Sequence, residues 1–486
     1  AAEDSGFGPV VEDNYQPAQP EDAEEPEGAD QPEGADQPED ADQPEDANQP
    51  EGADQPESAE EQESAGQRPQ PQQAAPAAAP AAPAPVNPKG NGVFGNIITV
   101  INKCADKALK LTLKDVKIDV SDTGKNTGNP WTSDEGKAAL SVQGKGNVEI
   151  ELDGKNELKS GAHRAGLEKN TSTSTGTLTL KDDNKEAGSL TATGGDWGAG
   201  IGNGGYYVNS DNRSGENITI TGGTVNATGG WGGAGIGGGY YGSGKNITIN
   251  GGTVNAKGGL DGAGIGGGYY YGGGYYGNGY YGNGENIKIT DGTVNATGGW
   301  GGAGIGGGGG GGNGAGGNGK NITIIGGTVT AGGGYRGAGI GGGISGSGKN
   351  ITINGGTVNA KGGLDGAGIG GGATGSGSNV TVSGAAQVTA IAGKSNDYYG
   401  AGATIGNGGN YTNGENVDGE EIQADISGVT TGYIHHIIYN PDGSLKREWW
   451  EPERPQPNPE DPNAPAEESN EVSLGTPGLH VETLEG

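Results

Sequence analysis

The sequence predicts an all-β fold, a three-sided β-solenoid flanked by low-complexity tails. The 486 residues include 110 glycines but only 2 Phe and no Met, so the chain lacks the large side chains of an ordinary globular core. A phrase of the type KNITI recurs six times, beginning at residues 216, 245, 285, 320, 349 and 378. Around each phrase, apolar and polar residues alternate with the period of two that strands require.

Each regular repeat is 29 residues long and contains three apolar pairs separated by Gly-rich turns. In residues 216–244 the pairs are Ile218 with Ile220, Val225 with Ala227, and Ala234 with Ile236. Periods of 20–50 residues are typical of solenoids. One coil buries too few apolar atoms to be stable alone, whereas stacked coils join the pairs into continuous ladders. We therefore expect three strands per coil and about nine coils between Leu109 and Ile405.

Asparagine recurs at one corner of the repeat. Asn tolerates the left-handed backbone conformation, and equivalent amides in stacked coils can bond to one another. We expect such an amide stack at the following positions: Asn217, Asn246, Asn286, Asn321, Asn350 and Asn379.

Composition divides the chain into five parts. Residues 1–68 are acidic six-residue repeats containing Pro, which we expect to be disordered. Residues 69–92 are a Pro/Ala-rich spacer, so the two segments together predict a stalk. Residues 93–430 form the β-helix, and 431–450 read as a hairpin that can cap its open end. The acidic, Pro-rich residues 451–486 are again expected to be disordered.

Charge and hydropathy exclude two classes of partner. The net charge is −33, and residues 1–88 alone hold 23 acidic residues against one Arg. No face gathers the basic residues that nucleic acid binding needs. No apolar run approaches the roughly 18 residues of a membrane span, so membrane insertion is not expected. The first residues, AAEDSG, fit cleavage by a signal peptidase and predict a secreted or cell-surface protein.

The repeat phrases resemble a known family. "NITINGGTVNA" and "GAGIGGG", preceded by "LKDVKIDV" and "NVEIELDGKNEL", are similar to the glycine-rich right-handed β-helix proteins of Gram-positive gut bacteria. These are often called carbohydrate-binding-domain proteins of the clostridial cell surface. The resemblance covers roughly residues 95–410. It implies a right-handed parallel β-helix, a surface location and polysaccharide binding.

Catalysis is not expected, and neither is a cofactor or a metal. Enzymes with right-handed β-helices need a carboxylate pair, or a calcium-binding Asp cluster with a basic residue. The outward acids Asp261 and Asp365 share a repeat position but lie about three coils, or about 14 Å, apart. His435 and His436 are strand neighbours that face opposite ways. The acids closest in sequence read as a solvated loop: Asp182, Asp183, Glu186 and Asp196.

Tyrosines are the candidate ligand-binding residues. Eleven of the 18 lie between residues 206 and 281, at the corner whose length varies between coils. Insertions in solenoids often mark the binding face, and Tyr rings suit sugars and protein partners alike. The candidates are Tyr206, Tyr207, Tyr240, Tyr241, Tyr269, Tyr270, Tyr271, Tyr275, Tyr276, Tyr280 and Tyr281.

Two further rows repeat once per coil. The first holds Trp231, Leu260, Trp300, Tyr335 and Leu364, and because two members are Leu we expect a packing ladder at that corner. The second is a row of Thr on the outer face of the middle strand, with Asn beside it. Such an array can order water, although Thr is also simply a good strand residue. Its Thr members are Thr224, Thr253, Thr293, Thr328 and Thr357.

These features together predict a non-catalytic extracellular surface protein. We expect a glycan-binding or adhesion module on a flexible stalk, with a polysaccharide or a host or bacterial surface glycan as its partner. A structural matrix or filament-forming protein that self-associates is the alternative. A polysaccharide-degrading β-helix enzyme comes third, and ice binding is a minor possibility.

Overall fold

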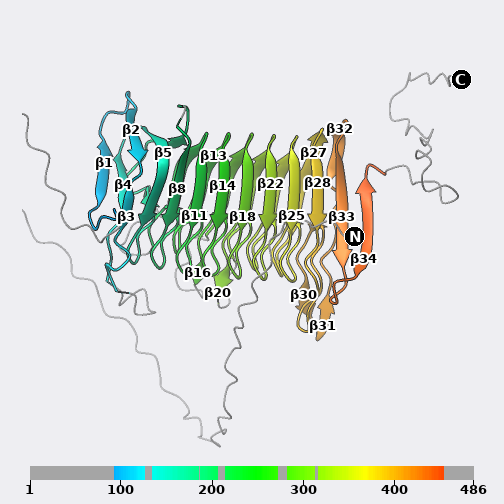
Figure 1. The fold of residues 1–486 in the computed structure, drawn as a ribbon. Coiled ribbons are helices and arrows are strands. Elements are labelled where there is room, and N and C mark those ends of the chain that lie inside the picture. The colour runs from blue at the N-terminus through cyan, green and yellow to red at the C-terminus, as the bar shows by residue number, and fades with distance from the viewer. Residues whose placement is uncertain are drawn as a thin grey trace, which may run out of the picture. The chain divides into compact units, whose positions relative to one another are not determined.

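The computed structural model describes residues 92–125, 134–184, 186–205, 214–271, 282–311 and 316–453. Within these ranges every regular element is a strand, and the strands stack in parallel into a β-helix (Figure 1). Residues 1–91 and 454–486, which contain almost all of the predicted tails, lie outside the described residues.

Each coil contributes one strand to each of three sheets. Sheet 1 contains ten strands: β1 (Ile98–Asn102), β4 (Leu140–Gly144), β6 (Leu167–Glu168), β9 (Ile201–Gly202), β12 (Ile236–Gly237), β15 (Ile265–Gly266), β19 (Ile305–Gly306), β23 (Ile340–Gly341), β26 (Ile369–Gly370) and β29 (Ile405–Gly406). The described part of the chain therefore forms ten coils. The nine coils expected between Leu109 and Ile405 are present, and the strands Ile98–Asn102, Asp425–Val429 and Tyr433–Tyr439 on either side of them add the tenth.

Sheets 2 and 3 are continuous with each other because β5 (Val148–Lys159) runs through both. Sheet 2 also contains β2 (Leu109–Lys114), β7 (Leu178–Lys181), β10 (Ser214–Ile220), β13 (Ser243–Ile249), β17 (Gly284–Ile289), β21 (Gly319–Ile324), β24 (Gly348–Ile353), β27 (Gly377–Gly384) and β32 (Asp425–Val429). Sheet 3 also contains β3 (Lys117–Asp119), β8 (Gly188–Thr193), β11 (Thr224–Thr228), β14 (Thr253–Lys257), β18 (Thr293–Thr297), β22 (Thr328–Gly332), β25 (Thr357–Lys361), β28 (Gln387–Ile391), β33 (Tyr433–Tyr439) and β34 (Leu445–Glu451).

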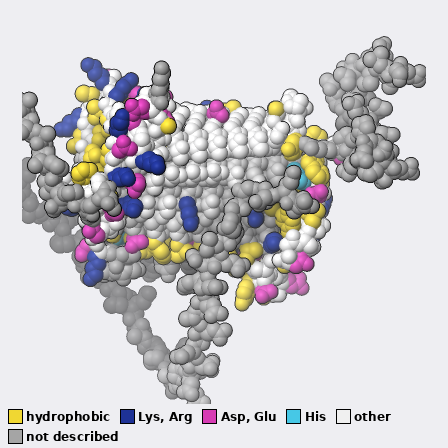
Figure 2. Space-filling view, in the orientation of Figure 1, with side chains coloured by type: hydrophobic (Ala, Val, Ile, Leu, Met, Phe, Trp, Pro, Cys, Tyr) yellow, Lys and Arg dark blue, Asp and Glu magenta, His cyan; other side chains and the backbone are white. Residues whose placement is uncertain are grey.

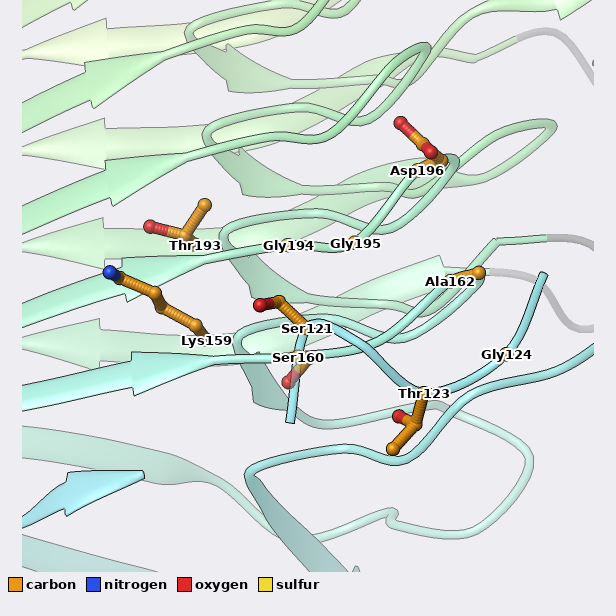
Figure 3. A pocket seen from close by; sticks show the side chains of 10 residues that line it. All are labelled: Ser121, Thr123, Gly124, Lys159, Ser160, Ala162, Thr193, Gly194, Gly195 and Asp196. Carbon is orange, nitrogen blue, oxygen red and sulfur yellow. The ribbon is translucent and has the colours of Figure 1, made fainter. Parts of the chain in front are cut away.

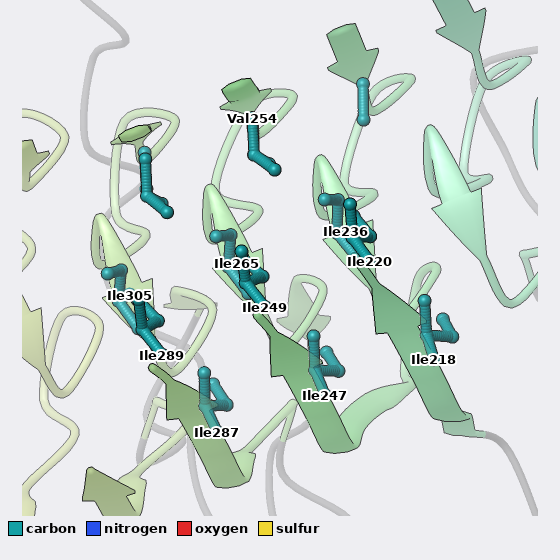
Figure 4. Close-up of a cluster of buried hydrophobic side chains, with 14 of the residues drawn as sticks. Ile218, Ile220, Ile236, Ile247, Ile249, Val254, Ile265, Ile287, Ile289 and Ile305 are labelled. Carbon is teal, nitrogen blue, oxygen red and sulfur yellow. The ribbon is translucent and has the colours of Figure 1, made fainter. Parts of the chain in front are cut away.

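The core consists of ladders of aliphatic side chains, one rung per coil. Ile218, Ile247 and Ile287 are register partners in sheet 2, and all three are fully buried (Figure 4). Ile265 and Ile305 are equally buried partners in sheet 1. The period-two pattern therefore identified the buried side of each strand correctly, and the predicted β-solenoid is confirmed.

The asparagine corner forms the expected amide stack. The six residues have φ between 52° and 58°, in the left-handed region. The Nδ2 of Asn286 donates to Oδ1 of Asn246 at 3.1 Å, and that of Asn321 donates to Asn286 at 3.1 Å. Each amide thus links its coil to the preceding one.

Glycine is required where sheet 1 turns. Gly306 has φ of 137°, and a Cβ there would lie 1.9 Å from the carbonyl oxygen of Gly341 in the next coil. Both the backbone angle and the close approach exclude any other side chain. The high Gly content of the repeat is therefore required for coils this tight to stack.

The C-terminal edges of sheets 1 and 3 are covered. β33 pairs in parallel with β28, and β34 folds back antiparallel to β33. Trp449 stacks on His436 and Trp450 on His435, with ring planes within 6°. In sheet 1 the Glu421 carboxylate accepts the backbone N–H groups of Thr404 and Ile405 (2.7 and 3.1 Å). These bonds occupy donors that a further coil would otherwise use.

Candidate functional site

Two Gly-rich loops of each coil lie on the same side of the β-helix. The 3–1 loop leads from sheet 3 to sheet 1 (for example 229–235), and the 1–2 loop leads from sheet 1 to sheet 2 (for example 238–242). Each 1–2 loop is bonded to a 3–1 loop one coil earlier: Tyr240 N–H donates to the Trp197 carbonyl at 2.7 Å, and Tyr269 N–H to Gly232 at 2.7 Å. The paired loops form a continuous structure along the β-helix, which we call the loop ridge.

A row of large apolar side chains is exposed on the loop ridge. We call these four residues, one in each of four consecutive 3–1 loops, the aromatic row: Trp231, Leu260, Trp300 and Tyr335, with exposed fractions of 37%, 44%, 44% and 48%. Hydrophobic side chains form a line along the lower edge of the body in Figure 2. The expected packing ladder at this corner is confirmed only in part, because the four side chains are exposed although the rings of Trp300 and Tyr335 stack, and Leu364 is half-buried.

The row is exposed because consecutive residues at the tip of each 3–1 loop point to opposite sides. Leu260 is exposed while Asp261, the next residue, is buried with φ of 64°. Leu364 and Asp365 repeat the pattern, and Asp365 is fully buried. Trp300 and Tyr335 share one orientation, with centroids 5.8 Å apart and ring planes within 7°.

The inward positions at one part of the ridge form an aromatic cluster. Trp197, Tyr240 and Tyr269 are buried together, and Tyr241 packs against them. The Trp197 ring lies edge to face against the rings of Tyr240 (4.3 Å) and Trp231 (4.1 Å). The cluster therefore supports the aromatic row from beneath.

These positions correct part of the tyrosine prediction. Tyr240 and Tyr269 are buried because their loops pack onto the preceding 3–1 loops, so their rings do not face solvent. Tyr241 and Tyr270 are half-buried and contact each other with centroids 5.1 Å apart. Tyr271 lies in β16 (Tyr270–Tyr271), which pairs with β20 (Gly310–Gly311). The remaining candidates lie outside the described residues: Tyr206, Tyr207, Tyr275, Tyr276, Tyr280 and Tyr281.

The two acids at the shared repeat position face inward, which corrects their interpretation as outward side chains. Asp261 accepts the Gly301 N–H, and its carboxylate occupies space that a side chain at Gly301 would fill. Burial raises the pKa of Asp261 to about 6. Burial also raises the pKa of Asp365 to about 6, although Arg336 and Asn396 favour its ionised form.

The other acids and histidines of the predictions make local contacts in two separate parts of the fold. Asp183 and Glu186 pair with Lys181 and Lys114, as expected of a charged surface loop. His436 is buried while the neighbouring His435 is half-buried, so the two face different sides. Among the described residues no three His, Cys, Asp or Glu side chains come together as metal ligands.

A shallow pocket of about 260 Å³ lies where the first coils meet the ridge (Figure 3). Its lining includes Lys159, Asp196 and several hydroxyl groups. The hydroxyls are used within the fold: Ser160 Oγ accepts the Ala139 N–H at 2.8 Å, and Thr123 Oγ1 donates to the Val120 carbonyl at 2.6 Å. They serve to tie the irregular early coils together, so we do not assign a ligand to this pocket.

The Thr row occupies the outer face of sheet 3 as expected. Thr224 and Thr293 are exposed, and Thr253 between them is half-buried. The adjacent amides bond to each other, with Asn255 Nδ2 donating to Asn226 Oδ1 at 2.8 Å. These bonds occupy amide groups that an array for ordering water would need to bond to water.

The comparisons with known proteins agree with this architecture. A family model for a β-helix repeat matches five segments of the chain: 218–240, 247–269, 287–309, 322–344 and 351–373. No curated protein and no solved structure matches the chain. The described residues contain no helix that is long and apolar enough to cross a membrane. The chain is therefore a β-helix protein, with stacked parallel strands built from β-helix repeats.

Proposed function

We propose that this protein is a non-catalytic extracellular surface protein that binds a glycan along the loop ridge. The observation that carries the proposal is the aromatic row, with one large exposed apolar side chain in each of four consecutive coils. Contiguous exposed apolar surface is uncommon on soluble proteins and marks interaction sites. Trp and Tyr combine a flat apolar ring with a polar tip, which suits the faces and hydroxyl groups of sugar rings.

The scaffold beneath the row supports this assignment. Trp231 rests on the buried Trp197 and Tyr269, and every 3–1 loop is bonded to a 1–2 loop. A ligand would therefore meet side chains that are already positioned, which lowers the entropic cost of binding. The resemblance to surface proteins of Gram-positive gut bacteria supports the extracellular location.

A binding role is favoured over catalysis by the acids of the ridge. Glycoside hydrolysis needs two carboxyl groups on either side of the scissile bond. In the regular described coils, Asp261 and Asp365 of the ridge are buried beneath the row, where they do not face a ligand.

Binding to immobilised polysaccharides tests the proposal. We expect the full chain to be retained and the double variant Trp300→Ala/Tyr335→Ala to lose about tenfold in affinity, on a scale of about 0.5–1.5 kcal/mol per aromatic contact. Thr293→Ala, on the outer face of sheet 3, is the matched control and should bind normally. Unchanged binding by a folded double variant would refute the ridge as the site.

Self-association into a matrix or filament is the second candidate function. One observation favours it: among the described strands, β1 and β2 each pair on one side only. Ile97, Ile101 and Leu109 are exposed near these edges. Unprotected strand edges favour pairing with another chain. Sedimentation at rising protein concentration tests this function. The wild-type protein should form assemblies that grow with concentration, and Ile101→Lys should prevent their formation.

A further inference from the structure

The loop ridge ends in a larger structure near the C-terminus. In most coils the 3–1 loop is short, as in residues 362–368, but between β28 and β29 it extends over residues 392–404. The following 1–2 connection contains the hairpin of β30 (Asn410–Thr412) and β31 (Glu415–Val417). In Figure 1 this hairpin extends beyond the neighbouring loops. We call residues 394–399 and 410–418, on either side of β29, the projection.

The projection exposes two tyrosines. Tyr398 is 73% exposed and Tyr411 is 53% exposed, more than any member of the aromatic row. Tyr399 lies between them and the ridge, and its ring contacts that of Tyr411 with centroids 6.5 Å apart. The projection thus presents aromatic side chains from both the extended 3–1 loop and the hairpin.

A buried polar network holds the projection in place. Asn396 Nδ2 donates to both carboxylate oxygens of Asp365, at 2.9 and 3.0 Å. Asn396 Oδ1 accepts the N–H groups of Tyr398 and Tyr399, at 2.7 and 2.9 Å. Burying a carboxylate is unfavourable unless it is paired and hydrogen-bonded. Asp365 is fully buried in a ridge built mainly from Gly and Ala, so this network is a specific structural device.

The same network connects the projection to the end of the aromatic row. The guanidinium of Arg336 lies 3.8 Å from the centroid of the Tyr399 ring, and its Nε lies 3.3 Å from Asp365. Arg336 directly follows Tyr335, the last member of the row, and Tyr399 directly follows Tyr398. The Arg336 side chain therefore reaches from the last coil of the row, past the coil of Leu364, to the projection.

We propose that Tyr398 and Tyr411 are further ligand-contacting residues, which continue the aromatic row and select a long polysaccharide chain. This inference rests on the proposed glycan-binding function. The 3–1 loops from Trp231 to Tyr398 span five coil steps of about 4.8 Å, or about 24 Å. A ligand that lies along the β-helix axis must be an extended polymer to contact both ends of this surface. Arg336, Asp365 and Asn396 are positioning residues.

Chain length is the variable that tests the proposal. The probes are xylan, mixed-linkage β-glucan and polygalacturonate, each compared with its trisaccharide, and the proteins are full-length chains. We expect the wild-type protein to bind at least one polymer at least tenfold more tightly than its trisaccharide. Tyr398→Ser/Tyr411→Ser should remove most of this preference.

The outcomes separate this inference from the proposed function. If Tyr398→Ser/Tyr411→Ser binds the polymer as tightly as the wild type while Trp300→Ala/Tyr335→Ala does not, the row binds glycan and the projection does not. If the wild type binds the trisaccharide as tightly as the polymer, the proposal for a long ligand fails. If the wild type binds none of the probes, both proposals fail.

A further variant distinguishes positioning from contact. Arg336→Ala should weaken polymer binding and also increase hydrogen exchange at residues 396–399, because Tyr399 and Asp365 lose a partner. Tyr398→Ser should weaken polymer binding without that increase. Equal exchange in Arg336→Ala and the wild type would show that Arg336 does not hold the projection.

Discussion

The rings of Trp197 and Tyr240 meet edge to face with centroids 4.3 Å apart, although the two residues lie in different loops. The Tyr240 N–H also donates to the Trp197 carbonyl at 2.7 Å. This contact holds a 1–2 loop against a 3–1 loop, and Trp231 rests on the outside of the same Trp197 ring. The buried aromatic side chains of the ridge therefore have a structural role, whereas the exposed ones are available to contact a ligand.

The first prediction separates these two roles. Tyr240→Ser should lower the free energy of unfolding by about 3 kcal/mol, because it leaves a cavity in the buried cluster. Trp300→Ala should cost less stability than Tyr240→Ser, since 44% of Trp300 is exposed, but it should weaken glycan binding. Urea unfolding followed by circular dichroism gives both stabilities. The reverse order of stabilities would mean that the buried and exposed positions are misassigned.

The second prediction concerns the asparagine corner. Asn286→Gly keeps the left-handed backbone accessible but removes two amide bonds, so it should destabilise the protein by about 1–2 kcal/mol. Asn286→Ala should cost about 1–2 kcal/mol more, because a non-Gly residue with a Cβ is strained at φ of 55°. The difference between the variants measures the strain, and equal values would leave the amide bonds as the only contribution.

The third prediction tests the ladders. Ile305 is fully buried with a ladder partner in each neighbouring coil, so Ile305→Ala should cost about 2–5 kcal/mol. Thr293 faces solvent in the same coil, and Thr293→Ala should change the free energy of unfolding by less than about 1 kcal/mol. Thermal unfolding of the two variants gives the comparison. Similar losses would contradict the observed register.

Most of the fold was predictable because stacking forces the sequence to repeat. A period of two within strands and a 29-residue period between coils determine which side chains face inward, as at Ile218 and Ile247. β1 was not counted as part of a coil because its sequence, ITVIN, contains no part of the repeat phrase.

The ridge was less predictable because loops have no fixed side-chain period. Comparison of the repeats within this sequence places Trp231 and Leu260 at the same corner. It does not show that the side chains at this position face solvent. At Leu260 that direction follows from the positive φ of the next residue, Asp261, and from the loop that packs beneath, whereas the residues after Trp300 and Tyr335 have no positive φ. Trp197 and Asp261 occupy the same inward position in different repeats, so the type of residue at this position does not indicate whether it is buried. The position of a residue within the GG-x-x-GAG phrase is a better indication of whether its side chain is buried.

The fourth prediction concerns acid stability at the C-terminal hairpin. Burial, followed by the charges of His435 and Arg447, lowers the pKa of His436 to about 4. The unfolded chain therefore binds a proton more tightly than the folded chain, so this stabilising contribution is complete above about pH 6.5 and is lost as the pH falls towards 4. The full difference is about 3 kcal/mol.

His436→Gln provides the measurement for that contribution. The wild-type advantage in free energy of unfolding over the variant should shrink as the pH is lowered from 7 to 4. His435→Gln is the control, since His435 is less buried and no comparable loss is expected. A wild-type advantage that is constant with pH would contradict a neutral, buried His436.

The fifth prediction concerns Asp261, whose carboxylate lies beneath Leu260 without a salt bridge. Its pKa of about 6 in the folded chain exceeds the value of 3.8 of an unperturbed Asp, so the folded state binds the proton more tightly. The stabilising contribution is therefore present below about pH 4 and is lost as the pH rises through 6. The loss is about 3 kcal/mol. Asp261→Asn removes the charge and should raise the free energy of unfolding at pH 8 while changing it little at pH 4.

Asp365 supplies the matched control because it occupies the same repeat position but has partners. Asp365→Asn leaves the half-buried Arg336 guanidinium without its carboxylate, which should make any gain in free energy of unfolding at pH 8 smaller than in Asp261→Asn. Chemical unfolding of both variants at pH 4 and pH 8 gives the four values needed. A loss of stability in Asp261→Asn at pH 8 would show that the ionised carboxylate has a favourable partner. In that case the buried charge would stabilise the ridge, and its burial would no longer be the dominant effect.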